Sequence, residues 1–373
     1  MTSNIKLLIV AGARPNFMKV APIIQELERR RAGNASGNGV TLDHRLVHTG
    51  QHYDPNMSGV FFKELGIPPP DISLDVGPGS HAVQTARIME RFEAACERER
   101  PDWVIVVGDV NSTMACTLVC SKLGIRVAHV EAGLRSFDRQ MPEEVNRVVT
   151  DALADLLLTP SEDGNVNLRR EGVPESKIRL VGNVMIDSLV ANLPRARMRP
   201  ILDQLRLSPK QFAYVTLHRP SNVDDRERLL KLLAELRHLA LTMPIVFPMH
   251  PRTRKMCERY AIPLDGAGSL LVLEPLGYHD SLRLTESSRY VLTDSGGLQE
   301  ETTYFRTPCL TLRDSTERPI TVSVGSNRLT RLEDLRAHVS QVLAGDLQTG
   351  QVPALWDGLT SPRIVDCIME AAA

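Results

Sequence analysis

Short apolar runs alternate with longer amphipathic segments along most of this chain. The runs Ile5–Ala11, Trp103–Gly108 and Phe212–Leu217 have the length of buried strands, and Ala82–Arg98 has apolar residues at helical spacing. Strands that alternate with helices in this way form βαβ units, in which a helix connects two parallel strands. The pattern therefore predicts an α/β fold that is built on parallel sheets.

The alternation occurs in two series, which predicts two domains. A length of 373 residues fits two or three domains. The stretch between the series, Leu193–Pro209, is rich in Arg and Pro and has no strand pattern. We place the boundary near residue 185, so that residues 1–185 and 186–359 form two doubly wound domains that face one another across a cleft.

The composition excludes several classes of partner. The chain has 44 Lys plus Arg against 45 Asp plus Glu, a net charge of -1, so it has no overall field that gathers nucleic acid or an anionic membrane. No apolar run approaches the roughly 18 residues of a membrane span, and no cleavable signal pattern is present. Six scattered cysteines are too sparse for a disulfide framework. We expect a cytoplasmic protein.

The loops after the strands are the first place to look for a site, because ligands of open parallel sheets bind beyond the carboxyl ends of the strands. The first such loop, Gly12–Asn16, contains Arg14, and Lys19 follows one turn into the next helix. Two cations at a helix start suit a phosphate, although a solvated helix start is the alternative. The loop lacks the G-x-G-x-x-G pattern, so it gives no support for NAD or FAD.

One acidic residue follows each of the next two strands, and a third stands at the start of the helix after them. Asp109 and Glu131 are one βα repeat apart, which places them at neighbouring strand ends, and Glu143 begins the following helix. Carboxylates that lie close together raise one another's pKa and suit acid–base chemistry near neutral pH. Each one alone also fits a helix cap or a helix start. The cluster of three favours the chemical interpretation.

A second group of polar residues joins a strand to a helix in the second series. Gly296 and Gly297 allow the backbone to approach a ligand closely, and Ser295 can cap the helix and contact a phosphate. Glu300 or Glu301 can bind a ribose diol. This segment predicts a nucleotide site.

Two further loops in the second series are open to more than one interpretation. His218 follows a strand and can protonate or hydrogen-bond a leaving phosphate, although a structural histidine is the commoner case. Arg313 lies in a polar loop after the last strong strand, where it either lines the cleft or is solvated. His48 and His52 have the i, i+4 spacing of some metal sites, but Gly50 argues against the helix that this spacing needs. We therefore predict no metal.

In their order along the chain, these segments resemble the non-hydrolysing UDP-N-acetylglucosamine 2-epimerase family. The resemblance covers about residues 5–330. It is carried by the segments Gly12–Lys19, Gly50–Asp54, Gly108–Ser112, His129–Arg135, Met141–Arg147, Thr216–Arg219, Asp294–Glu301 and Arg313–Pro319. The resemblance implies two Rossmann-like domains of the glycosyltransferase-B type, with the catalytic carboxylates in the first and UDP bound by the second. It also implies that the final helix, 360–373, returns to the first domain.

The activity implied by the resemblance is the interconversion of UDP-GlcNAc and UDP-ManNAc, which supplies ManNAc-type sugars for polysaccharide synthesis. Family members use neither NAD nor a metal, eliminate UDP to give 2-acetamidoglucal, re-add it, and are usually homodimers. By motif position, Asp109, Glu131 and Glu143 resemble the catalytic carboxylates, and His218 the group that assists UDP departure. The implied substrate ligands are Arg14, Lys19, Arg135, Ser295, Gly296, Gly297, Glu301 and Arg313.

Other functions remain as alternatives. A 2-epimerase that acts on UDP-2,3-diacetamido glucuronic acid shares several of these segments, but Leu134 stands where that group tends to have Asn. A retaining glycosyltransferase gives no reason for three clustered carboxylates. A hydrolysing epimerase releases UDP, and a non-catalytic sensor only binds the sugar nucleotide. Pro220 stands where many relatives have a second Arg, which argues against allosteric activation by UDP-GlcNAc.

Overall fold

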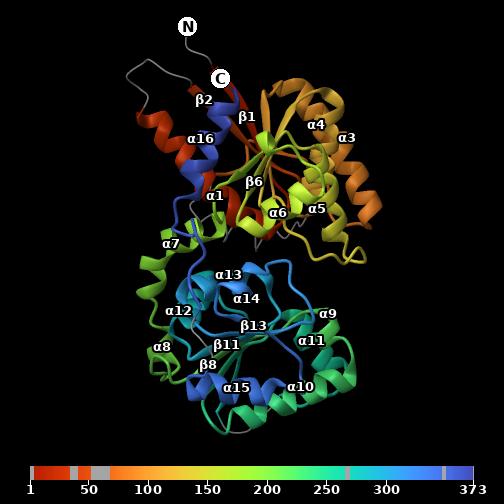
Figure 1. Ribbon diagram of the computed structural model, residues 1–373. Helices are drawn as coiled ribbons and strands as arrows, with labels where there is room; N and C mark the ends of the chain where they lie inside the picture. Colours follow the sequence, from red (N-terminus) through yellow and green to blue (C-terminus); the bar gives the residue numbers. More distant parts are fainter. Residues whose placement is uncertain (1–3, 34–40, 52–67, 265–268, 347–349, 373) are drawn as a thin grey trace. The chain divides into compact units, whose positions relative to one another are not determined.

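The computed structural model describes residues 4–33, 41–51, 68–264, 269–346 and 350–372 (Figure 1). The chain divides into two compact units, one of Met1–Ser188 with Ala354–Ala373 and the other of Leu189–Pro353. The boundary that we placed near residue 185 falls inside helix α7 (Val184–Arg197), which the two units share. Each unit contains one parallel sheet, so the predicted α/β class is confirmed.

The sheet of the first unit has the strand order β3-β2-β1-β4-β5-β6-β7, and all neighbours are parallel. In its register, Leu7 lies opposite Trp103, and Ala11 lies opposite His48. The strands are β1 (Asn4–Ala11), β2 (Thr41–His48), β3 (Ile72–Ser73), β4 (Trp103–Val107), β5 (Arg126–Val130), β6 (Leu156–Thr159) and β7 (Ile178–Leu180). The order reverses between β1 and β4, where such sheets bind ligands.

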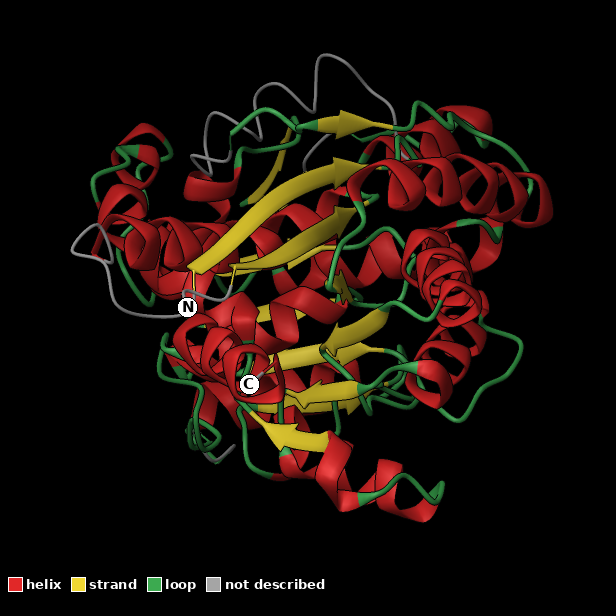
Figure 2. Ribbon diagram, turned by 90° about the horizontal axis from the view of Figure 1, so that it is seen from above, coloured by secondary structure: helices red, strands yellow, loops and turns green. Residues whose placement is uncertain are grey.

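Helices cover both faces of this sheet, which explains why its central strands are mostly apolar. Figure 1 places α1 and α16 on one side of the strands and α3 and α4 on the other, and Figure 2 shows the same layers from above. All five residues of β4 are buried. The helices are α1 (Arg14–Gly33), α3 (His81–Glu99), α4 (Asn111–Leu123), α5 (Pro142–Leu153), α6 (Glu162–Arg170) and α16 (Thr360–Ala372), with a short 3₁₀ turn at Glu175–Lys177.

The C-terminal helix α16 belongs to the first unit, where it packs on α1. Asp187 of α7 caps its start, because its buried carboxylate accepts hydrogen bonds from the backbone N–H groups of Thr360 (3.0 Å) and Ser361 (2.6 Å) and from the Ser361 hydroxyl. Arg30 of α1 adds an ion pair with Asp366 (2.6 Å). These contacts join the two ends of the chain within one unit.

Replacing Asp187 with Ala is expected to lower the free energy of unfolding by about 2–3 kcal/mol, because buried donors at the start of α16 lose a charged acceptor. Urea unfolding followed by circular dichroism measures the change. Asp366→Ala is the matched control on the same helix. It removes only a surface ion pair and should cost less than about 1 kcal/mol. Equal losses in the two variants would show that Asp187 is not the main attachment of α16.

The second unit repeats this architecture with the strand order β10-β9-β8-β11-β12-β13, again parallel. Its strands are β8 (Ala213–Thr216), β9 (Ile245–Pro248), β10 (Leu270–Leu273), β11 (Tyr290–Thr293), β12 (Cys309–Leu312) and β13 (Asn327–Thr330). Its helices are α8 (Ile201–Gln204), α9 (Pro220–Val223), α10 (Arg226–Leu239), α11 (Pro251–Arg259), α12 (Tyr278–Ser287), α13 (Gly296–Phe305), α14 (Ile320–Ser323) and α15 (Leu335–Ala344). The order reverses between β8 and β11. No helix among the described residues is long and apolar enough to span a membrane.

Candidate active site

A buried ion pair lies at the reversal point of the first sheet. The ammonium group of Lys19, in the first turns of α1, contacts the carboxylate of Glu131, which directly follows β5. Both side chains are about 95% buried, at 6% and 4% exposure. Removing two charges from water costs more than the pair returns in most proteins, so such a pair is weak evidence for a stabilising role. Its position at the strand ends favours a chemical one.

Gly108 makes room for this pair. Its φ is +67°, which strains any residue with a side chain, and a Cβ atom there would lie 2.7 Å from Lys19 Nζ and push the ammonium group aside. Asn16 fixes the loop on the other side. Its Oδ1 accepts the N–H groups of Gly12 and Ala13, and its Nδ2 donates to the carbonyl of Val107, each at 3.0 Å. Lys19 is thereby placed beside the loop that carries Asp109.

Asp109 has a cationic partner of its own. Its Oδ2 lies 2.5 Å from Nη1 of Arg147, a buried residue of α5, and about a quarter of the Asp109 side chain remains exposed. Arg147 also pairs with Glu144 at 2.7 Å. Burial raises the pKa of Glu144, but the N–H groups of Ser136 and Phe137 and the Arg147 guanidinium outweigh it, so the pKa lies below its ordinary value. Glu144 is therefore an ionised support for Arg147.

Asp109 and Glu143 line one hollow of about 340 Å³ in the first unit. Glu143 is exposed at the start of α5, where its charge favours the helix dipole. Most of the remaining lining is uncharged: Gln51, Pro78, Gly79, His81, Gln84, Val110, Asn111, Pro142 and Asn146. The structure thus brings two of the three predicted carboxylates to one surface. The third, Glu131, is held by Lys19 instead of clustering with them.

Amide side chains surround this hollow, and Asn146 among them was not predicted as a site residue. Asn146 Nδ2 donates to the backbone carbonyl of Asp109 (2.9 Å), and Gln51 Oε1 accepts from the N–H (3.0 Å) and hydroxyl (2.7 Å) of Ser112. The sequence did contain one signal. Asn146 follows Glu143 by three residues, so both lie on one face of α5.

Arg135, which the resemblance placed at the substrate, lies elsewhere. Its guanidinium is buried between Asp151 (2.7 Å) and Glu171 (2.7 Å), and it does not line the hollow. The side chain of Arg14 and all of His52 lie outside the described residues. Among the residues that the structure describes, no group of three His, Cys, Asp or Glu side chains gathers as a metal site.

In the second unit, a buried carboxylate orients His218. Asp294 directly follows β11 and accepts the N–H groups of His218 (3.0 Å) and Arg219 (2.9 Å). Its Oδ1 also lies 3.1 Å from Nδ1 of His218, whose side chain is 37% exposed. Burial raises the pKa of Asp294, but His218 and the donors outweigh it and leave the pKa below its ordinary value. The ionised carboxylate therefore favours a hydrogen on Nδ1, which leaves Nε2 for another partner.

The N-terminus of α13 lies beside this histidine loop, because β8 and β11 are neighbouring strands. Ser295 is the N-cap residue of α13. A Cβ atom on Gly296 would lie 2.8 Å from Arg318 Nη1, whereas one on Gly297 would meet no atom within 4 Å. The free N–H groups of a helix start attract anions, and open space next to Gly297 allows one to approach.

Arg313 and Glu301 complete the predicted residues of the second unit. Arg313 pairs with Glu317 (2.8 Å) and is 7% exposed, and its Nη1 has no hydrogen-bond partner among the described residues. Glu301 is buried in α13, and this burial, together with Glu300, raises its pKa to about 8. Glu300 in turn contacts Arg318 (2.8 Å). The residue pattern alone allowed either glutamate to bind the ribose, and the family resemblance favoured Glu301.

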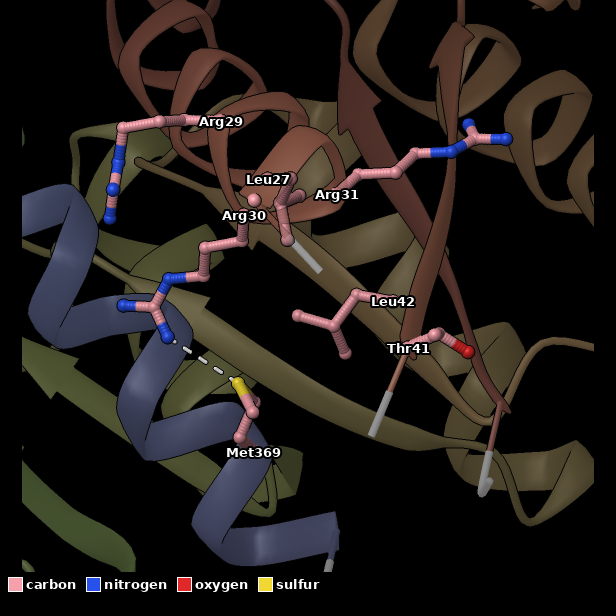
Figure 3. Close-up of a pocket in the computed structure, with 8 residues that line it drawn as sticks. Leu27, Arg29, Arg30, Arg31, Thr41, Leu42 and Met369 are labelled. Carbon is pink, nitrogen blue, oxygen red and sulfur yellow. Dashed lines mark hydrogen bonds between the residues drawn. The ribbon is translucent and has the colours of Figure 1, made fainter. Parts of the chain in front are cut away.

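A larger hollow, of about 440 Å³, lies at the end of α1 (Figure 3). Three consecutive arginines of α1 line it, but Arg29 and Arg30 both pair with Glu26, at 2.7 and 2.6 Å. Arg30 also donates to the sulfur of Met369 (3.4 Å), the dashed line in Figure 3. Because two of its three cations are already neutralised and no strand carboxyl end reaches it, we do not assign it to the site.

Comparisons with known proteins identify the family. A family model described as UDP-N-acetylglucosamine 2-epimerase matches residues 36–369. The UDP-N-acetylglucosamine 2-epimerase of Methanocaldococcus jannaschii is 42% identical over 332 residues, which are 87% of this chain and 88% of that protein. The UDP-2,3-diacetamido-2,3-dideoxy-D-glucuronate 2-epimerase of Pseudomonas aeruginosa is 41% identical over 327 residues, with the same two coverages.

A solved structure supports the same assignment. The UDP-GlcNAc 2-epimerase of Methanocaldococcus jannaschii, in complex with UDP-GlcNAc and UDP, superposes with a TM-score of 0.86 at 39% sequence identity. The match covers 98% of this chain and 100% of that one. The family match and the fold together show that this chain belongs to the UDP-N-acetylglucosamine 2-epimerase family of isomerases.

Proposed function

We propose that this chain interconverts UDP-N-acetylglucosamine and UDP-N-acetylmannosamine by inverting C2 of the sugar. The observation that carries the proposal is the placement of Asp109 and Glu143 on one hollow, with the Lys19–Glu131 pair beside the same loop. Inversion needs a proton to leave one face of C2 and another to arrive on the opposite face. Separate carboxylates can serve the two faces.

The proposed reaction is elimination followed by re-addition. A carboxylate takes the proton from C2, the C2–H electron pair becomes the C1=C2 double bond of 2-acetamidoglucal, and the C1–O bond breaks as UDP takes its electron pair. UDP then adds back to C1 while a proton is delivered to the other face of C2. No outside oxidant, reductant or water enters the sum of these steps.

The second unit is proposed to bind and stabilise UDP. A departing diphosphate gains negative charge, so donors that already point toward it lower the barrier. Such donors are the N-terminus of α13 at Ser295, Gly296 and Gly297 and the buried guanidinium of Arg313. His218 joins them when its Nε2 carries a hydrogen in addition to the one on Nδ1. Glu301 is proposed to bind the ribose. We also retain the homodimer and the supply of ManNAc-type sugars to polysaccharide synthesis as proposals.

Proton NMR of UDP-GlcNAc with the protein in heavy water tests this function. We expect signals of UDP-ManNAc and deuterium at C2 of both sugars, because the proton that returns comes from solvent. Steady release of free UDP and ManNAc would indicate a hydrolysing enzyme instead. Transfer of the sugar to an added acceptor, with no deuterium at C2, would indicate a glycosyltransferase.

A second candidate substrate is UDP-2,3-diacetamido-2,3-dideoxy-D-glucuronate. The relative of that name in Pseudomonas aeruginosa is 41% identical to this chain, nearly as similar as the UDP-GlcNAc enzyme quoted above. The same NMR experiment with that sugar separates the two. Turnover of the diacetamido uronate alone would replace our substrate and leave the reaction unchanged.

Asp294→Asn is expected to lower kcat by about 10- to 100-fold, because the amide no longer favours the hydrogen on Nδ1 of His218. KM should change little if His218 acts mainly on the departing UDP. Asp225→Asn is the control, since Asp225 caps α10 of the same unit by accepting the N–H of Arg228 (2.8 Å) and does not contact His218. Similar losses of kcat in both variants would point to general destabilisation.

A further inference from the structure

A fully buried histidine, His129, links two loops that carry the proposed catalytic carboxylates. It lies near the end of β5, and its Nδ1 is 2.6 Å from Asp151 Oδ1, while its Nε2 is 2.8 Å from the carbonyl oxygen of Gly108. A carbonyl oxygen carries no hydrogen, and neither does an ionised carboxylate. Both ring nitrogens therefore face acceptors, and a ring that donates to both at once is an imidazolium.

Asp151 continues the chain of charges. Its Oδ2 accepts the N–H of Gly133 (3.0 Å) and lies 2.7 Å from Nη1 of Arg135, which reaches Glu171 at 2.7 Å. Burial raises the pKa of Asp151, but His129 and Arg135 outweigh it, so the pKa lies below its ordinary value. Positive and negative groups thus alternate from His129 to Glu171, and each buried charge has a partner.

The network holds backbone that would not keep its conformation alone. Gly108, Glu131 and Gly133 all have left-handed φ angles, of +67°, +73° and +81°. For Glu131, which has a side chain, this conformation persists only where its surroundings impose it. The imidazolium binds the carbonyl that precedes Asp109, and Asp151 binds the N–H two residues after Glu131. One buried pair therefore constrains both loops.

We propose that His129 and Asp151 are positioning residues that hold Asp109 and Glu131 in the relative geometry needed to move protons at C2. This inference rests on the proposed epimerisation. In the role proposed here, neither residue contacts the substrate. Arg135 and Glu171 hold Asp151 in place from the side nearer the surface. Arg135 therefore acts as a further positioning residue and does not bind the sugar.

The variants His129→Gln and Asp151→Asn test the proposal in the full chain. Each should lower kcat by about 10- to 100-fold while KM stays within about threefold, because binding groups are untouched. Asp155→Asn is the control. Asp155 accepts the N–H of Val127 (2.9 Å) at the opposite end of the same strand, so its loss should leave kcat within about twofold. Unchanged kcat in the two test variants, or a rise in KM alone, would overturn the proposal.

Nitrogen-15 NMR of the histidine ring in the unaltered protein provides a test that does not depend on variants folding. We expect both ring nitrogens of His129 to carry hydrogen at neutral pH. A ring with one bare nitrogen would break the link between the two loops and overturn the proposal. If the parent protein epimerises no UDP-sugar, the proposed function fails, whereas the NMR result still reports on the link itself.

Discussion

Replacing Glu131 with Gln is expected to lower kcat for UDP-GlcNAc epimerisation by about 10²- to 10⁴-fold. An amide of nearly the same shape neither takes up nor delivers a proton at C2. It also leaves the ammonium group of Lys19 buried beside a neutral partner, which alters the local field at the sugar. Initial rates from proton NMR, with circular dichroism to confirm folding, measure the effect.

Two further measurements distinguish a chemical role for Glu131 from a structural one. Glu175→Gln removes an exposed carboxylate that pairs with Arg169 on the surface of the same unit, and it should leave kcat within about twofold. Deuterium exchange at C2 should fall in parallel with kcat in Glu131→Gln. A variant that loses epimerisation but keeps full C2 exchange would show that Glu131 does not take the first proton, and that it delivers the proton to the opposite face of C2 or acts on UDP.

The apolar runs predicted the strands that form the middle of each sheet. β4 is buried along its whole length, so its sequence is apolar without interruption, whereas β5 is interrupted by the buried His129 and begins with the exposed Arg126. Among the edge strands, β10 (Leu270–Leu273) is itself an apolar run and was predicted, whereas β3, β7 and β13 were missed. β13 (Asn327–Thr330) includes a charged residue, and β3 is only two residues long, so neither produces an apolar run. Helix α9, of four residues, is likewise too short to show a helical period.

The candidate site residues that could be predicted from the sequence are those that directly follow a strand. The rule that ligands lie beyond the carboxyl ends of parallel strands led to Asp109, Glu131 and His218. The sequence did not reveal which charges pair with one another. Asp294 and His218 come from neighbouring strands that are far apart in sequence, and their pairing depends on the register of β8 against β11.

The contacts of Arg135 could not be predicted from the sequence either. A motif position indicates that a residue matters but not which way its side chain points, and here it points away from the hollow toward Asp151 and Glu171. The partners of a buried cation are set by packing across elements, in this case α5 and the end of α6. Their spacing in the sequence carries no signal of that contact.

Glu301→Gln is expected to make the substrate-free protein more stable at pH 8 and to weaken UDP binding at the same time. Glu301 is buried in α13, and desolvation, with the negative Glu300 nearby, raises its pKa from an ordinary 4.5 to about 8. Gln keeps the shape and the hydrogen-bonding capacity but has no charge to bury. If Glu301 binds the ribose diol, the variant replaces one of the two carboxylate oxygens with an NH2 group and loses the charge-assisted hydrogen bond, which should raise the Kd for UDP about tenfold.

The pH dependence of this stability difference follows from proton binding. Between pH 4.5 and pH 8 the folded chain keeps the proton on Glu301 and the unfolded chain has lost it, so the parent loses stability as pH rises through this window. At about 1.4 kcal/mol per pH unit, the advantage of Glu301→Gln grows to at most about 5 kcal/mol by pH 8. Urea unfolding at several pH values measures it, with the exposed Glu258→Gln as control. A difference that does not change with pH would mean that Glu301 is already ionised at pH 5, and that the buried charge is tolerated before any ribose arrives.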